Sequence, residues 1–225
     1  MLDLIMAINK SMTPVEELRT VALVTIAERY PEPEWIHIYT DGSATEANKN
    51  VVASVCSSLF QLSAPAGENA TNFDGEVAAI TLALEKITGA RAKKIVLLSD
   101  SRAALLAIAS GHPSTNARIL ACRKSIECKR EIFKVLVMQW IPAHCGIPGN
   151  EEADRHARLG SSQPHPLLPI TMGMAKEMAR SAITERAEER SRGECGKKNW
   201  AALLDPKSDF TKSGVSGKLL VGYWT

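Results

Sequence analysis

Four acidic residues stand where carboxylates could act together in catalysis. Asp41 and Asp100 each follow a run of apolar and β-branched residues that is typical of a buried strand. Glu76 and Asp154 lie in the first turn or two of predicted helices. Because ligand sites in open α/β sheets lie beyond the carboxyl ends of the strands, we expect Asp41 and Asp100 to meet there.

Carboxylates gathered in this way repel one another strongly unless they are protonated or bind cations. Hard oxygen ligands without a convergent cysteine or histidine favour Mg²⁺ or Mn²⁺ over Zn²⁺. Several carboxylates can hold two such ions roughly 3.5–4 Å apart, an arrangement suited to in-line displacement at a phosphodiester. The four acids therefore predict a two-metal site.

Each acid also has a structural explanation. Asp41 and the glycine after it could be a turn, and Asp100 could cap the helix that starts at Ser101. Glu76 and Asp154 could compensate the charge of a helix N-terminus. Taken singly, these explanations are as good as catalysis, but the four acids together favour the metal site.

Composition limits the function classes. The chain has 225 residues, 45% of them hydrophobic, and a formal net charge of +2, so overall charge does not identify a nucleic-acid binder. Five cysteines without a C-x-x-C pair indicate reduced thiols. The first residues are too short and too acidic for a secretory signal, and no apolar run approaches a membrane span. We therefore expect an intracellular protein, cytoplasmic or nuclear and not secreted, that does not bind a membrane.

The elements that must position the acids follow from apolar periodicity and from turn residues. The predicted strands are 35–40, 48–56, 57–64, 94–100 and 133–141, and the predicted helices are 14–30, 76–88, 101–110, 115–129 and 150–159. Thr13 and Glu16 form a candidate capping box for the first helix, and Gly89 a candidate stop for the second. This order predicts an α/β fold, a five-stranded mixed sheet with helices on both faces.

Three parts follow from the linkers. Residues 1–33 read as a helical lead-in with a proline-containing linker, 34–162 as the main domain, and 163–225 as a tail with one amphipathic helix. The last thirty residues have no readable period.

Four motifs resemble those of ribonuclease H, type 1. They are Tyr39-Thr-Asp-Gly-Ser43, Thr71-Asn-x-x-x-Glu76, Leu98-Ser-Asp-Ser101 and the block from Trp140 to Asp154. The likeness spans about residues 34–160 and is greatest to the ribonuclease H domains of non-LTR retrotransposon polyproteins. It implies a ribonuclease H-like fold and cleavage of the RNA strand of an RNA/DNA hybrid.

The resemblance also implies roles for individual residues. Asp41 would bridge two Mg²⁺ or Mn²⁺ ions, with Glu76 and Asp100 on one ion and Asp154 on the other. His144 matches a mobile-loop histidine that assists proton transfer or product release. Residues implied to contact the hybrid are Gly42, Ser43, Thr71, Asn72 and Asn150. Arg102, which directly follows Asp100-Ser101, is a candidate phosphate contact from its position and could equally be solvated. Gly42 would let the RNA backbone approach, while Asn150 would cap the last helix and could also touch the site. The implied partner is the hybrid, with no small-molecule cofactor and a monomeric state.

The chain departs from the family in one respect. Some members carry a basic protrusion between two helices, and here only Gly111–Thr115 intervenes. The next candidates for phosphate contact are two clusters, each of which could equally be a solvated face: Arg118, Arg123, Lys124, Lys129 and Arg130, and second Arg91, Lys93 and Lys94. Two rival functions stay open: another nuclease or integrase of the same fold, and a non-catalytic hybrid-binding relic of a mobile element.

Overall fold

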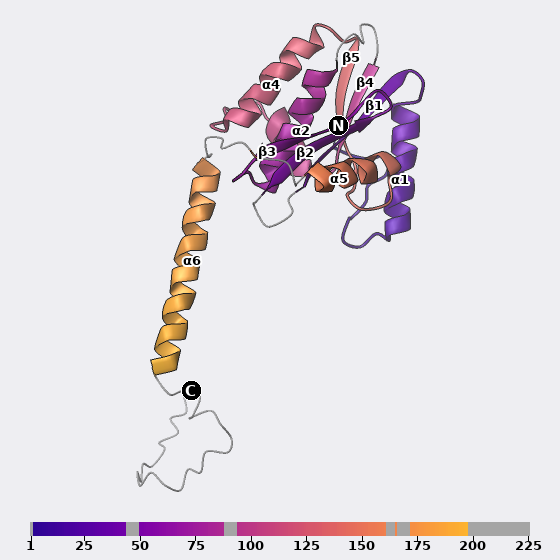
Figure 1. Ribbon diagram of the computed structural model, residues 1–225. Coiled ribbons are helices and arrows are strands. Elements are labelled where there is room, and N and C mark those ends of the chain that lie inside the picture. Colours follow the sequence, from indigo (N-terminus) through magenta and orange to yellow (C-terminus); the bar gives the residue numbers. More distant parts are fainter. Residues whose placement is uncertain (1, 44–49, 88–93, 161–164, 166–171, 198–225) are drawn as a thin grey trace, which may run out of the picture. The chain divides into compact units, whose positions relative to one another are not determined.

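A five-stranded mixed sheet carries the elements of the site, in the order β3-β2-β1-β4-β5 (Figure 1). The computed structural model describes residues 2–43, 50–87, 94–160, 165 and 172–197. β1, β4 and β5 run parallel, and β2 and β3 join them as antiparallel strands, as the sequence predicted. The strands are β1 Trp35–Ser43, β2 Val51–Ser57, β3 Gln61–Gly67, β4 Lys94–Ser99 and β5 Val135–Trp140.

Helices cover both faces of this sheet, which confirms the predicted architecture (Figure 1). In β4, Ile95 and Leu97 pack in one core with helices α2, α3 and α4, while Val96 and Leu98 pack in a second core with α1. Burial on both faces explains why the residues from Ile95 to Leu98 form an unbroken apolar run rather than an alternating pattern. The helices are α1 Val15–Arg29, α2 Asn72–Lys86, α3 Arg102–Ala109, α4 Ala117–Arg130, α5 Pro148–Gly160 and α6 Met172–Lys197.

The capping box expected at the first helix is wrong. The residue that precedes α1 is Pro14, with an extended ψ of 149°, and no side chain caps the helix there. Because the backbone of Pro14 is extended, the helix begins one residue later than the sequence suggested, and Thr13 and Glu16 no longer have capping positions.

The expected turn at Asp41-Gly42-Ser43 is also wrong, because β1 continues through these residues. Asp41 pairs with Ser54, and Ser43 pairs with Val52. The second and third strands begin and end later than expected. The connection between the predicted strand 57–64 and the predicted helix 76–88 therefore shortens at both ends, since β3 reaches Gly67 and α2 begins at Asn72.

The N-terminal segment shares the core of the sheet. Leu18 and Ile26 of α1 pack with Val96 and Ile141, and Leu4 packs in the core on the other face. Residues 1–175 form one compact unit and residues 176–225 another. The three-part division at 33 and 162 stays a prediction. The expected stop at Gly89 and residues 198–225, which make up nearly all of the last thirty, fall outside the described residues.

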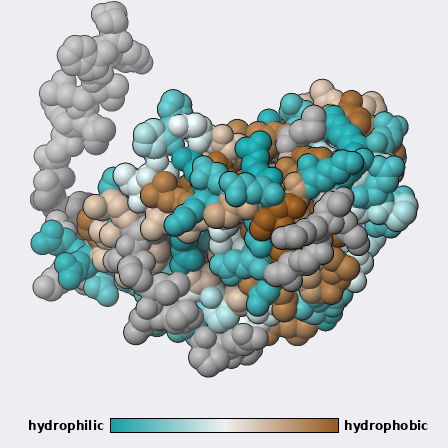
Figure 2. All heavy atoms as spheres, turned by 90° about the horizontal axis from the view of Figure 1, so that it is seen from above, coloured by the Kyte–Doolittle hydropathy of each residue, from teal (hydrophilic) through white to brown (hydrophobic). Residues whose placement is uncertain are grey.

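None of the described helices is long and apolar enough to cross a membrane. On the face shown in Figure 2, hydrophilic residues are interspersed with hydrophobic ones.

Candidate active site

Three of the four predicted carboxylates meet at the end of the parallel strands. Oxygens of Asp41, Glu76 and Asp100 lie within 4.8 Å of one another. The register of the parallel pair sets this, since Thr40 of β1 lies opposite Ser99 at the end of β4 and each of these residues is followed in the chain by an aspartate. Glu76 enters from the second turn of α2. The sequence predicted the meeting of Asp41 and Asp100, and the structure places both there.

A contact between two glycines brings Glu76 to this point. A Cβ added to Gly42 would lie 2.2 Å from the backbone nitrogen of Glu76 and 2.4 Å from the carbonyl carbon of Gly75. A Cβ on Gly75 would lie 2.5 Å from a methyl of Val51. The missing side chain of Gly42 therefore makes room for α2. An approach of the RNA backbone at Gly42 stays a prediction.

Electrostatics at these carboxylates favours a bound cation. Burial, followed by the charges of Asp100 and Asp154, raises the pKa of Asp41 to about 7. Burial and the charges of Asp100 and Asp41 raise the pKa of Glu76 well above its usual value, and burial raises that of Asp100. One oxygen each of Asp41 and Glu76 is buried without a hydrogen-bond partner among the described residues. Buried carboxylate oxygens without partners are costly, so this set of donors fits a divalent cation.

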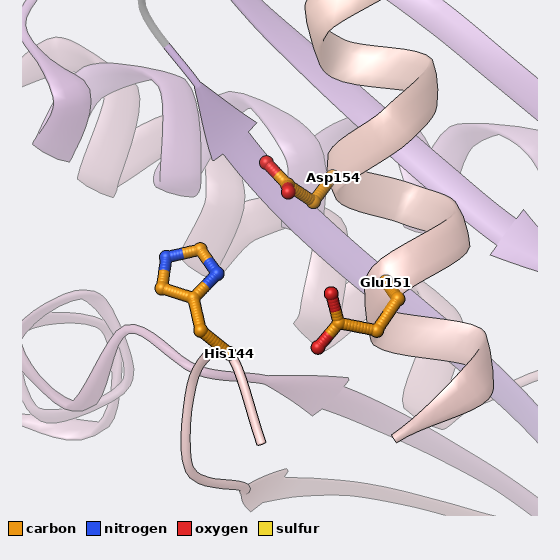
Figure 3. Close-up of side chains that lie close together, drawn as sticks. All are labelled: His144, Glu151 and Asp154. Atoms are coloured by element: carbon orange, nitrogen blue, oxygen red, sulfur yellow. The ribbon is translucent and has the colours of Figure 1, made fainter. Parts of the chain in front are cut away.

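Asp154 belongs to a second group of side chains. Asp154 lies with His144 and Glu151 (Figure 3). One possible ligand atom from each of the three residues lies within 4.8 Å of the other two. Oδ2 of Asp154 also pairs with Arg158 at 2.6 Å. The four acids are thus arranged as three plus one, and Asp154 is close enough to Asp41 to raise its pKa.

Glu151 is a residue of this group that the sequence analysis did not select. The backbone N–H of Gly146 donates to its Oε1 at 3.0 Å, so Glu151 fixes the loop that carries His144. The signal was present, because Glu151 and Asp154 are three residues apart on one helix and therefore share a face. His144 is exposed, with a φ of +51° that is uncommon outside glycine.

Asn150 contacts the site and does not cap a helix. α5 begins at Pro148, which places Asn150 in the first turn, where its Nδ2 lies 3.4 Å from Oδ2 of Asp100. The expectation that it caps this helix is wrong. Asp100 is no cap either, since the hydroxyl of Ser101 accepts from the N–H of Ala104 at the start of α3. The backbone carbonyl of Asp100 accepts a hydrogen bond from Nε1 of Trp140 at 3.1 Å.

The expected substrate contacts fall in different places. Thr71 caps α2 in a reciprocal capping box with Asp74, so its side chain is already used in the fold. Asn72 is exposed beside it, and Ser43 is half-buried at the end of β1. The Arg102 guanidinium lies 5.8 Å from the centre of the Trp140 ring, close to Asp100 in the chain.

The basic cluster on α4 is largely committed to the fold. Arg118 donates to the carbonyl of Ala66, and Lys129 donates to that of Ile87. Arg123 donates to three carbonyls around the end of α3, those of Ala107, Ile108 and His112. These three cations therefore support the fold, and contact of the cluster with phosphates stays a prediction. Of the second cluster, Lys94 pairs with Glu34 at 2.6 Å, and Arg91 and Lys93 lie outside the described residues.

Comparison with protein families agrees with this geometry. The family model described as RNase H matches residues 33–162, more than half of the chain. The matched part includes all five strands, the carboxylates and His144.

Proposed function

The chain belongs to the RNase H family, and on that premise we propose that it is an endoribonuclease that hydrolyses the RNA strand of RNA/DNA hybrids with two metal ions. Membership of the family suggests nuclease activity on such hybrids. The observation that supports the finer proposal is the meeting of Asp41, Glu76 and Asp100, with buried oxygens that have no partner in the described protein.

Asp41, Glu76, Asp100 and Asp154 are the residues that would hold the ions. Asp41 is the acid between the two groups, because the charges of Asp100 on one side and Asp154 on the other both raise its pKa. All four offer hard oxygen donors, which suits Mg²⁺ and also Mn²⁺. When bound, two such ions orient an attacking water and stabilise the attacking and leaving oxygens.

Other residues orient the reacting groups or move protons. Asn150 donates to Asp100 and holds that carboxylate in place. His144 is exposed on a loop beside Asp154, so its imidazole can carry a proton to or from the reacting phosphate. The hydrogen bond from Gly146 to Glu151 keeps this loop near α5.

The biological setting is proposed from the resemblance and from the composition of the chain. We propose an intracellular, monomeric enzyme from a retrotransposon whose partner is the hybrid. Recognition of 2′-hydroxyls in the wide minor groove would make the activity tolerant of sequence.

The test is a cleavage assay with Mg²⁺ on end-labelled RNA/DNA hybrid, duplex DNA and single-stranded RNA. We expect cleavage of the RNA of the hybrid alone, lost by about a thousandfold or more in Asp41→Asn and Asp100→Asn, since metal stabilisation supplies several kcal/mol. Glu127→Gln, an exposed acid on α4, is the matched control and should retain activity. Binding of the hybrid without cleavage would favour the relic, and cleavage of duplex DNA would contradict the proposal.

A further inference from the structure

The segment before the family match is fixed against the edge strand of the sheet. Leu4 is buried in the main core, and the N–H of Ile5 donates to the hydroxyl of Thr25. Arg29 and Gln139 of β5 both donate to the carbonyl of Asp3. Residues 2–8 also enclose a cavity of about 220 Å³ with Arg102 and Trp140. The start of the chain is therefore a built part of the fold beside β5.

This segment places two cations next to the active site. A Cβ on Gly146 would lie 3.5 Å from the Arg19 side chain, so Arg19 of α1 borders the His144 loop. Lys10 follows the residues that line a cavity with Arg102 and Trp140, and it precedes α1, which borders the His144 loop. Its positive charge opposes the burial that raises the pKa of Asp100 and of Cys145. Neither cation has a hydrogen-bond or ion-pair partner within the described part of the chain.

Lys10 and Arg19 are candidates for the phosphate contacts that a basic protrusion makes in other members of the family. The chain lacks a basic protrusion, and three cations of the α4 cluster are committed to backbone carbonyls. A hybrid in the site still presents closely spaced phosphates that need neutralising. Unpaired cations at the rim, with Arg102 nearby, are placed for that role.

We propose that Lys10 and Arg19 bind phosphates of the RNA/DNA hybrid next to the cleaved bond, so that the N-terminal segment forms one wall of the substrate-binding surface. This inference rests on the proposed function. Both residues act through charge, because the phosphate backbone is the same in every sequence.

The test measures the affinity of the full chain for a fluorescent hybrid in EDTA, over a range of salt concentrations, for Lys10→Gln, Arg19→Gln and the double variant. Each phosphate contact contributes about 0.9 to the slope of log K against log salt. At about 0.1 M salt, each single variant should therefore bind about eightfold more weakly, with a slope smaller by about 0.9. Lys10→Arg should keep the affinity. Lys86→Gln, an exposed cation ten residues beyond Glu76 on α2, is the matched control.

The outcomes separate the two proposals. A wild-type protein that cleaves the hybrid, with variants of unchanged affinity and salt slope, would overturn the inference and leave the proposed function intact. An equal loss of affinity in Lys86→Gln would also overturn it, because the effect would then follow from net charge. A wild type that neither binds nor cleaves the hybrid would overturn both.

Discussion

Replacing Asp41 with asparagine should abolish cleavage and yet stabilise the metal-free protein. The pKa of Asp41 is raised from 3.8 to about 7, first by burial and then by Asp100 and Asp154. In the folded state this group holds its proton more tightly than in the unfolded state. Its contribution to stability is therefore complete below pH 4 and is lost as the pH rises through 7.

The size of the effect follows from the two pKa values. Relative to a residue that stays neutral, Asp41 lowers the free energy of unfolding by about 4 kcal/mol at pH 8, because its pKa is raised by roughly three units at about 1.4 kcal/mol per unit. At pH 5 the loss is only between about 1 and 2 kcal/mol. Asparagine is neutral at both pH 5 and pH 8. The stability advantage of Asp41→Asn over the wild type should therefore grow by roughly 2–3 kcal/mol between pH 5 and pH 8.

The measurement is urea unfolding in EDTA at several pH values, repeated with Mg²⁺. Added Mg²⁺ should stabilise the wild type, because an ion that binds only the folded state stabilises it, and should stabilise the variant less. Glu127→Gln, which replaces an exposed acid on α4, is the matched control for the loss of one negative charge. An advantage of Asp41→Asn that stays constant from pH 5 to pH 8 would refute the assignment of this cost to the buried carboxylate.

Two predictions concern the packing that holds the site. Gly42→Ala should lower the free energy of unfolding by about 1–3 kcal/mol, because its Cβ would meet backbone atoms of Gly75 and Glu76. The control Gly111→Ala has open space around its Cβ and should not lower it, so equal urea midpoints for the two variants would contradict the close approach. Thr71→Ala should lower the free energy of unfolding by about 1 kcal/mol in the absence of nucleic acid, because it removes the cap of α2, whereas Thr71→Ser should keep the cap. A variant of unchanged stability that binds the hybrid more weakly would instead make Thr71 a substrate contact.

The sequence predicted the sheet well because its central strands leave little choice. β4 is buried on both faces, so Ile95, Val96, Leu97 and Leu98 form an unbroken apolar run that is typical of a central strand. The meeting of Asp41 and Asp100 follows in turn from the parallel pairing of β1 and β4. The ends of elements were less predictable, since they depend on pairing. Asp41-Gly42-Ser43 has turn chemistry in isolation, and only β2 makes it a strand.

Charged residues were predictable in type but not in use. The cations of α4 form a run in the sequence, and nothing in that run shows that Arg123 reaches three carbonyls beyond the end of α3. Arg19 lies in a segment without a family motif, and only the packing of α1 brings it to the His144 loop. The use of each cation therefore depends on partners that are distant in the sequence, which local sequence patterns do not indicate.

The two findings at Gly42 and Asp41 belong to one arrangement. The contact between Gly42 and Gly75 gives α2 its close approach to β1, and that approach places Glu76 against Asp41. The same approach buries both carboxylates and raises the pKa of each. A fold that only needed stability would gain by a neutral residue at position 41, since the metal-free site is costly at neutral pH. A cation relieves that cost, so stability at neutral pH and occupancy of the site should rise together.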